Sequence, residues 1–288
     1  MTDSTCELCL NLLRADTEVD VIALLEQAGY WNDRDAWRYF GDLENNWSTI
    51  GNQQSSPDAA LVEKLVNSVD ARLMGECYVR GLEPDGATAP SSMRAAIAEF
   101  FDDTRLEQSP SAGLIKNWPD AKRTEIARSI TLAATGAKAR GASGNPCFTI
   151  VDSGEGQTPD DMPVTLMSLS KTNKLRIPFV QGKFNMGGTG VFKFCGKSNL
   201  QLVITRRNPK AIRNMTGEAR MWSFTVVRRE DPERGRRSSV YTYLAPLWKD
   251  ESPSKGAVLR FQTDELLLFP QGKEPYARGC KWGTAIKL

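Results

Sequence analysis

The spacing of apolar residues divides the chain into a helical first half and a strand-rich second half. After Thr17 and after Ser56, apolar side chains recur at helical intervals, and both residues are good N-caps. Gly29 ends the first pattern, and Pro57 suits the first turn of the second. We therefore predict one helix from Thr17 to Gly29 and another from Ser56 to about Leu73.

Residues 84–146 separate the second helix from the first predicted strand. They begin with turn-forming residues and continue with two helical stretches, at about 92–107 and 119–138. A short β-branched strand is expected at 147–152. We interpret 84–146 as an insertion with helices of its own.

Strand-like segments dominate the last third of the chain. Several alternate apolar and polar residues, as in an antiparallel sheet with one covered face. We predict strands at Leu200–Thr205, Met221–Arg228, Ser239–Leu244, Ala257–Phe261 and Thr284–Leu288.

Composition is that of an ordinary globular protein. The 288 residues include 37 Lys and Arg against 35 Asp and Glu, and 40% are hydrophobic. No apolar run reaches about 18 residues and no signal peptide is visible, so we expect a cytoplasmic protein without membrane contact. The absence of histidine excludes a Ser-His-Asp triad and histidine-containing metal sites within the chain. Cys6 and Cys9 have no second pair nearby and are interpreted as incidental.

Charge is distributed unevenly. Residues 1–50 hold 10 acidic and 3 basic side chains, and they are rich in aromatic residues. We interpret them as a cap over the main domain, 51–288, or as a dimerisation arm. Residues 205–237 hold 10 basic and 4 acidic side chains. They form solvated strand faces or a surface for nucleic acid.

Three polar residues of the second predicted helix share one face, opposite an apolar one. Glu63, Asn67 and Asp70 stand at i, i+4 and i+7. The amide oxygen of Asn67 could complete the coordination of Mg²⁺. The carboxylate of Glu63 could take a proton from water that attacks a γ-phosphate.

A second polar feature ends the strand at 147–152. The Asp152 carboxylate could accept a hydrogen bond from an exocyclic amine such as adenine N6. Gly154 and Gly156 let the backbone approach a base closely. Thr284, at the start of the last strand, could add a hydroxyl beside the same base.

A glycine cluster at 182–190 could cradle phosphates through successive backbone N–H groups. Its candidate ligand-binding residues are Gly182, Lys183, Asn185, Gly187, Gly188, Thr189 and Gly190. The sequence contains no Walker A motif, and the glycines do not have the Rossmann spacing.

Together these features resemble the GHKL ATPases: gyrase B-type topoisomerase subunits, the large heat-shock chaperone, sensor histidine kinases and MutL-type repair proteins. Glu63, Asn67 and Asp70-Ala71 match the E-x-x-x-N-x-x-D-A box of that family. Asp152, Gly154 and Gly156 match its D-x-G-x-G box. The glycine cluster and Gly283-Thr284 are similar to its last two boxes. In the glycine box, either Asn185 replaces a usual glycine or the box is shifted onto Gly188-Thr189-Gly190.

The resemblance implies a Bergerat fold, an α+β two-layer sandwich with a mixed, mostly antiparallel sheet and helices on one face. By position, Glu63 would activate water, Asn67 would bind Mg²⁺ and Asp152 would select adenine. The glycines would line the phosphates, and Thr284 would support Asp152.

Residues 157–190 would form an ATP lid. The lid carries Lys171, Lys174, Arg176 and Lys183. One lid lysine, such as Lys171 or Lys183, would contact the γ-phosphate, or these lysines are simply solvated. ATP binding would close the lid and promote a homodimer. We expect an Mg²⁺-dependent ATPase module of a larger DNA-linked or anti-phage defence machine, with DNA or a downstream effector as partner. The alternatives are a non-catalytic nucleotide sensor, a nucleic-acid-binding protein and, least favoured, a histidine kinase.

Overall fold

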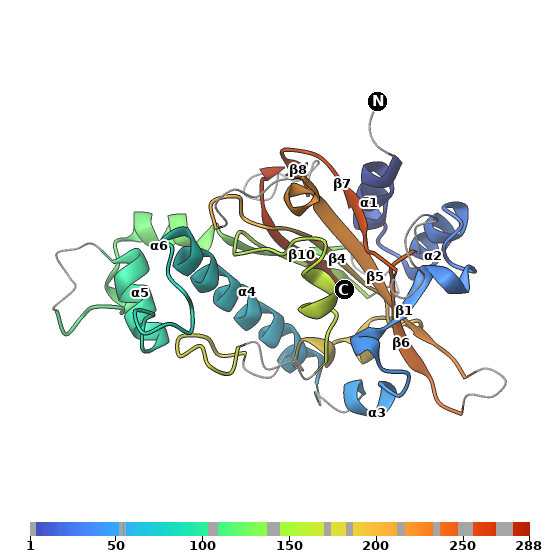
Figure 1. The fold of residues 1–288 in the computed structure, drawn as a ribbon, viewed down its shortest axis with the longest axis horizontal. Helices are drawn as coiled ribbons and strands as arrows, with labels where there is room; N and C mark the ends of the chain where they lie inside the picture. The colour runs from blue at the N-terminus through green and yellow to red at the C-terminus, as the bar shows by residue number, and fades with distance from the viewer. Residues whose placement is uncertain are drawn as a thin grey trace.

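Most strands of the second half join one antiparallel sheet (Figure 1). The computed structural model describes residues 4–51, 54, 56–102, 109–136, 145–169, 174–182, 187–211, 217–232, 237–246, 256–268 and 279–288. Every strand pair among them is antiparallel, and with six α-helices they confirm the predicted α+β class.

Eight strands make up the main sheet, in the order β1-β6-β5-β4-β10-β3-β2, with β7 paired to β5. Their bounds are β1 Trp37–Tyr39, β2 Ile130–Thr135, β3 Cys147–Asp152, β4 Gln201–Arg206, β5 Trp222–Glu230, β6 Val240–Leu244, β7 Leu259–Phe261 and β10 Gly283–Lys287. A separate two-stranded sheet pairs β8 (Leu266–Leu267) with β9 (Gly279–Cys280). All six strands predicted from the sequence are present.

The six α-helices lie in the first half of the chain. They are α1 Ser4–Arg14, α2 Glu18–Gln27, α3 Trp47–Ile50, α4 Pro57–Val79, α5 Met93–Phe101 and α6 Asp120–Ala127. Short 3-10 helices are η1 Arg34–Ala36, η2 Phe40–Asp42, η4 Ile115–Asn117, η5 Met162–Val164, η6 Gly187–Thr189, η7 Phe192–Phe194 and η8 Gly217–Arg220.

The two helices predicted most firmly begin where the capping residues placed them. The hydroxyl of Thr17 accepts a hydrogen bond from Asp20 N and caps α2. The hydroxyl of Ser56 does the same for Ala59 N at the start of α4. Gly29 follows α2 with a φ of +82°, the left-handed conformation that ends many helices.

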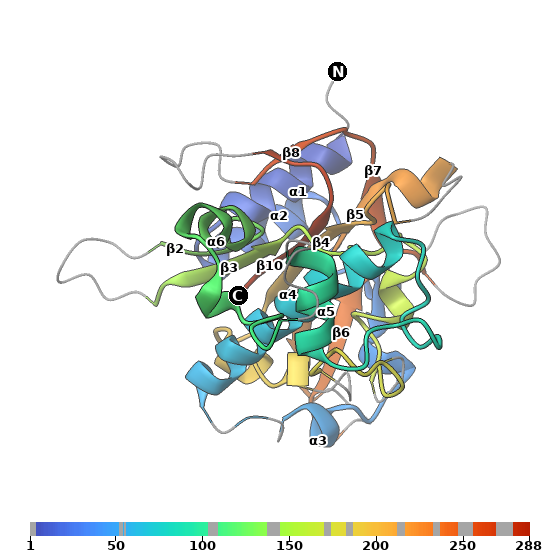
Figure 2. The same ribbon diagram turned by 90° about the vertical axis from the view of Figure 1, so that its left-hand side faces the viewer.

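Helices cover both faces of the sheet, so the expected arrangement with helices on one face is wrong (Figures 1 and 2). On β4, Leu202 and Ile204 pack with α1 and α2, whereas Val203 packs on the face that Ala60 of α4 covers. The physical reason is that the acidic first 50 residues contain an amphipathic helix, α1, that the sequence interpretation did not include.

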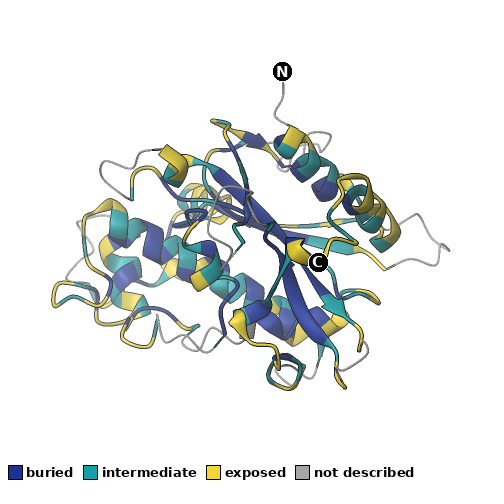
Figure 3. Ribbon diagram, turned by 45° about the vertical axis from the view of Figure 1, so that its right-hand side comes forward, coloured by how far each residue is buried: buried dark blue, intermediate teal, exposed yellow. Residues whose placement is uncertain are grey.

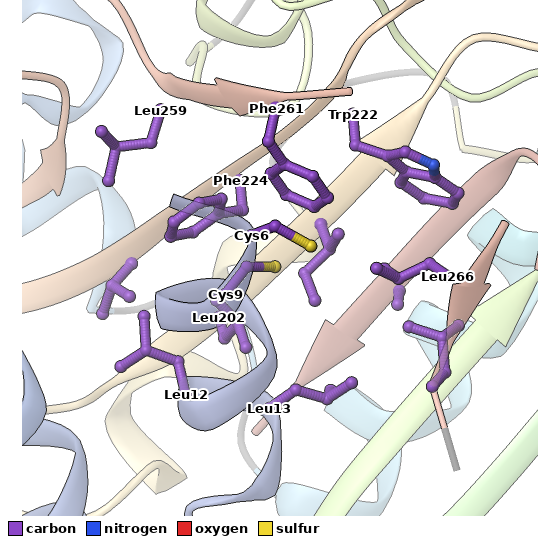
Figure 4. Packing of buried hydrophobic residues seen from close by; sticks show 14 of the residues in the cluster. Cys6, Cys9, Leu12, Leu13, Leu202, Trp222, Phe224, Leu259, Phe261 and Leu266 are labelled. Atoms are coloured by element: carbon purple, nitrogen blue, oxygen red, sulfur yellow. The ribbon is translucent and has the colours of Figure 1, made fainter. Parts of the chain in front are cut away.

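Helix α1 seals one face of the sheet (Figure 4). Its buried residues Cys6, Cys9, Leu12 and Leu13 meet aromatic side chains of β5 and β7, among them Phe224. Both cysteines therefore act as core residues. Figure 3 shows the same separation of a buried sheet from exposed outer helix surfaces.

The N-terminal segment also extends the sheet edge. Strand β1 pairs with β6, with Trp37 opposite Leu244. The buried Asn46 side chain donates to the carbonyls of Phe40 and Tyr241 and accepts from Tyr241 N. Residues 37–46 are thus joined to the main sheet by backbone pairing and by a fully satisfied buried amide.

The helical stretch predicted at 119–138 is too long. Helix α6 ends at Ala127, and Ile130–Thr135 forms β2, which pairs with β3 along its whole length. The alanines at 133 and 134 favour a helix locally, but the neighbouring strand supplies backbone partners that the local pattern does not reveal. The first stretch is confirmed as α5 over Met93–Phe101; residues 103–107 of that prediction lie outside the described residues.

The side of helix α4 that carries Asp70 faces the interior of the protein. Val62 and Val69 are 57% and 38% exposed, whereas Asp70 is fully buried. The buried positions of the helix are Ala60, Lys64, Ser68, Asp70, Leu73, Met74, Gly75 and Cys77. The polar groups are buried because they meet backbone and a cavity, as described below.

Candidate functional site

Glycines bring the turn after β3 directly onto α4. A Cβ on Gly154 would lie 2.6 Å from the carbonyl carbon of Ala71, and one on Gly75 would lie 3.0 Å from Glu155 N. The close approach lets Glu155 N donate to Ala71 O, at 2.9 Å. Gly156 has a φ of +59°, and a Cβ there would lie 1.8 Å from Arg206 O. These glycines hold Asp152 against the helix.

A cavity of about 730 Å³ lies between α4, the ends of β3 and β10, and the segments 157–166, 174–182 and 188–192. Seven of the predicted site residues line it: Glu63, Asn67, Asp152, Gly182, Gly188, Thr189 and Thr284. They come from four separated segments of the sequence. The cavity is large enough for a nucleotide-sized ligand.

Other predicted residues lie beside the cavity or outside the described part of the chain. Gly154 and Gly156 shape the turn, and Gly187 and Gly190 flank the lining residues, but none of these four lines the cavity. Lys171, Lys183 and Asn185 lie outside the described residues.

Asp152 is a buried carboxyl group at the inner end of the cavity. Only 5% of the residue is exposed, and Oδ1 accepts a hydrogen bond from Gly154 N at 3.0 Å. Burial raises the pKa of Asp152 to about 7, although hydrogen bonds from Gly154 N and the Ser68 side chain oppose this shift. The group therefore titrates near neutral pH.

Thr284 faces Asp152 across the β10–β3 pairing. Its Oγ1 lies 3.0 Å from Oγ1 of Thr205. The Thr205 hydroxyl donates to Gly283 O at 3.0 Å and accepts from Gln157 N at 2.9 Å. Thr205 has one proton to donate, so Thr284 donates to it and keeps its lone pairs for another donor.

Asp70 holds a backbone turn. Its two carboxylate oxygens accept from Gln181 N at 2.9 Å and Gly182 N at 2.8 Å. It does not line the cavity, and its side chain is fully buried beneath the turn. The structure thus places Asp70 where it positions Gly182.

The glycine cluster closes over the predicted Mg²⁺-binding position. A Cβ on Gly182 would lie 2.6 Å from Oδ1 of Asn67, and one on Gly188 would lie 3.9 Å from Nδ2 of the same amide. Because these glycines have no side chains, space beside the Asn67 amide stays open. The described residues contain no group of three or more Cys, Asp or Glu able to hold a metal ion. An ion at Asn67 therefore needs oxygen ligands from a bound molecule or water.

Glu63 is half-buried at the cavity wall. Nε2 of Gln54 donates to its Oε2 at 2.6 Å. This contact fixes one carboxylate oxygen and leaves the other for a different donor. The sequence analysis did not identify Gln54, since nothing in the local pattern links it to a residue nine positions later.

Three further lining residues, none of them predicted from the sequence, form a cluster: the buried pair Glu155 and Arg207, and the half-buried Tyr78. Nη1 of Arg207 lies 3.1 Å from Oε2 of Glu155, and its guanidinium stacks 4.8 Å from the Tyr78 ring centroid. Burial raises the pKa of Glu155, and Arg207 opposes that shift. Glu155 lies inside the D-x-G-x-G match, so its position in the motif was an available signal.

Several basic residues of the stretch 205–237 make contacts within the described protein. Arg206 donates to the carbonyls of Arg220, Thr263, Asp264 and Lys281. Arg207 pairs with Glu155, and Arg228 pairs with Glu230 at 2.8 Å. Residues 212–216 and 233–236 of this stretch lie outside the described residues.

A scan against protein-family models found no match for this chain, and a search of curated proteins found none either. Across the described ranges, no helix combines the length and the apolar character needed to cross a bilayer.

Proposed function

We propose that the protein is an ATP-binding and ATP-hydrolysing module of the GHKL type, with a Bergerat fold. The observation that carries this proposal is that one cavity gathers Glu63, Asn67, Asp152 and Thr284 with glycines of the 182–190 cluster. The sequence motifs lie far apart along the chain, and their meeting in one cavity is not expected by chance.

Asp152 and Thr284 form the proposed adenine-binding end. The ionised carboxylate of Asp152 accepts from the exocyclic N6 amine, because one of its oxygens is already oriented by Gly154 N. Thr284 supplies a second acceptor beside it, since its own proton is directed to Thr205. This arrangement distinguishes an amine from a carbonyl at that position of the base.

Asn67 and the glycine cluster form the proposed phosphate end. Open space beside the Asn67 amide, left by Gly182 and Gly188, fits a cation that also contacts phosphate oxygens. Mg²⁺, when bound, neutralises developing charge on the phosphates. Backbone N–H groups at 187–190 add neutral donors without occupying the space.

Glu63 is the proposed general base. It lies one helical turn from Asn67 on the same side of α4, and Gln54 restricts its carboxylate. A proton taken from water by this carboxylate gives the nucleophile for γ-phosphate cleavage. The resemblance to the GHKL ATPases also predicts dimerisation upon ATP binding and coupling to DNA or to a downstream effector.

Calorimetry with ATP, in the presence and absence of Mg²⁺, tests the binding part of this proposal. We expect Mg²⁺-linked binding by the wild type and a loss of about tenfold or more in Asp152→Asn, whose amide opposes the adenine amine. Asp160→Asn is the matched control, because Asp160 is in the adjoining loop and its side chain is 88% exposed. Absence of ATP binding by the wild type would refute the proposal.

Turnover by Glu63→Gln tests the hydrolytic part. The variant should retain ATP binding while hydrolysis falls by about a hundredfold or more, because the amide cannot accept the proton. Glu125→Gln, a change of the same type at an exposed position of α6, should match the wild type. Equal turnover by Glu63→Gln and the wild type would remove Glu63 as the base and favour a different water-activating group.

A further inference from the structure

Lys64 places an ammonium group inside the cavity, from the middle of the α4 motif. The residue is only 6% exposed, and it lines the cavity next to Glu63 and Asn67. It projects from the buried side of the helix, at the same level as the glycine cluster. A lysine is rarely buried to this extent without an anionic partner.

The ammonium group forms no ion pair with a described residue, although the Glu63 carboxylate is near enough to attract it. No hydrogen bond or ion pair joins Lys64 Nζ to another described residue, and its nearest aromatic ring is Phe192, with the centroid 5.9 Å from Nζ. That distance is at the limit of a cation–π contact. Burial lowers the pKa of Lys64 to about 8, opposed by electrostatic attraction to Cys195 and Glu63. The group is therefore mainly protonated at neutral pH.

Gly188 leaves the approach to this ammonium group open. A Cβ at Gly188 would lie 3.7 Å from Lys64 Nζ and 3.9 Å from Nδ2 of Asn67. A ligand that follows the glycine backbone therefore passes both side chains. An anion bound there would pair with a buried positive charge that forms no ion pair with a described residue.

We propose that Lys64 binds the polyphosphate of the nucleotide. Helix α4 then supplies three residues at the phosphate groups: the cation Lys64, and Glu63 and Asn67. This inference rests on the proposed function, and it goes beyond it by assigning the cation to Lys64. The ammonium group donates to phosphate oxygens from the α4 side, opposite the glycine N–H groups. Its protonated form is stabilised by the anion it binds.

The test compares Lys64→Met with the wild type by calorimetry at about pH 7, where the lysine is protonated. Methionine preserves most of the buried stem and removes the charge, so folding is retained. Lys193→Met is the matched control, since Lys193 is exposed on η7 close by. The probes are ATP, adenosine and inorganic tripolyphosphate, each with Mg²⁺.

We expect Lys64→Met to weaken ATP and tripolyphosphate binding by about tenfold to a hundredfold, with adenosine binding unchanged. Lys193→Met should bind all three as the wild type does. If the wild type binds both ATP and adenosine, and Lys64→Met binds ATP as tightly as the wild type does, the assignment of Lys64 is overturned while the proposed function stands.

Two other results separate the claims. If the wild type binds tripolyphosphate through Lys64 but does not bind adenosine or prefer ATP, the anion site is supported and the proposed adenine-nucleotide function fails. If the wild type binds neither ATP nor tripolyphosphate, both claims fail. Equal weakening of adenosine binding in Lys64→Met would show a general disturbance of the cavity and contradict a phosphate-specific role.

Discussion

The carboxylate of Asp70 on α4 accepts the backbone N–H of Gly182, with 2.8 Å between Oδ2 and N. The same carboxylate also accepts from Gln181 N, so one buried side chain binds two successive amides. Gly182 in turn lies against Asn67, one helical turn before Asp70. Asp70 thus sets the distance between the glycine turn and the amide proposed to bind Mg²⁺.

Replacement of Asp70 by Asn should release that turn. One acceptor oxygen remains, while the new NH₂ group opposes the second backbone N–H, so we expect a loss of about 2–4 kcal/mol in the free energy of unfolding. Urea unfolding measures the loss, and hydrogen exchange at Gln181 and Gly182 should accelerate. Asp58→Asn, in the exposed first turn of the same helix, should cost less than about 1 kcal/mol. A similar loss in both variants would contradict the specific role of Asp70.

Two glycine-to-alanine variants distinguish displacement of the Asn67 side chain from a general change in the glycine cluster. The alanine methyl of Gly182→Ala would lie 2.6 Å from Asn67 Oδ1 and must displace that amide. The methyl of Gly188→Ala makes only ordinary contacts, at 3.7 Å or more from side-chain nitrogens. We therefore expect Gly182→Ala to lower Mg²⁺-dependent ATP affinity by about tenfold or more and Gly188→Ala to change it less. Calorimetry with and without Mg²⁺ distinguishes them, and equal losses would refute the steric argument.

The sequence predicted strands β3, β4, β5, β6, β7 and β10, but not strand β2 or helix α1. Strands β4, β5 and β6 were predicted from their β-branched and aromatic residues, and each lies between two partner strands and is buried along most of its length. Strand β2 was missed because its state depends on pairing with β3, a non-local contact that its alanines do not encode. In α1, Cys6, Cys9, Leu12 and Leu13 do have helical spacing, but the interpretation of the cysteines as incidental hid that signal.

The site was predictable to the extent that its residues belong to recognisable motifs. The motifs indicated Asp152 and Asn67, and both line the cavity. Lys64 and Glu155 lie inside the same motifs, but a periodicity argument assigns charged residues to solvent, and both are buried. Gln54 and Arg207 come from elsewhere in the chain and meet the site only through the tertiary structure.

The close packing of the β3 turn predicts different costs at two glycines with similar backbone conformation. Gly156 and Gly217 have φ values of +59° and +57°. A Cβ at Gly156 would lie 1.8 Å from Arg206 O, whereas nothing lies within 4 Å of one at Gly217. Gly217→Ala should cost about 1 kcal/mol from backbone strain, and Gly156→Ala roughly 3 kcal/mol or more. Urea unfolding of both variants measures the difference, and equal costs would contradict the packing argument.

The raised pKa of Asp152 makes a prediction for stability as a function of pH. The unfolded-state pKa is near 3.9, and burial raises the folded-state pKa to about 7, so the folded state holds this proton more tightly. The contribution of Asp152 to stability is therefore greatest below about pH 4 and decreases as pH rises to about 7. In the wild type this decrease in stability amounts to roughly 2 kcal/mol between about pH 5 and pH 7. The Asp152→Asn variant has no carboxyl group at this position and should lack it. Matched urea titrations of the wild type and the variant would contradict the shift if their slopes against pH were the same.

The same titration should control recognition of the base. If the ionised carboxylate accepts the adenine amine, adenosine affinity rises with pH and reaches a plateau above about pH 7. At about pH 6 the affinity should be roughly tenfold below the plateau, because only about a tenth of the carboxyl groups is ionised. Adenosine is the appropriate ligand, since it carries no phosphate that titrates in this range. Glu155 raises the pKa of Asp152 and Lys174 lowers it, so Lys174→Met should move the midpoint to higher pH. Calorimetry across this range tests both statements, and an affinity independent of pH would refute a role for ionised Asp152 in binding the amine.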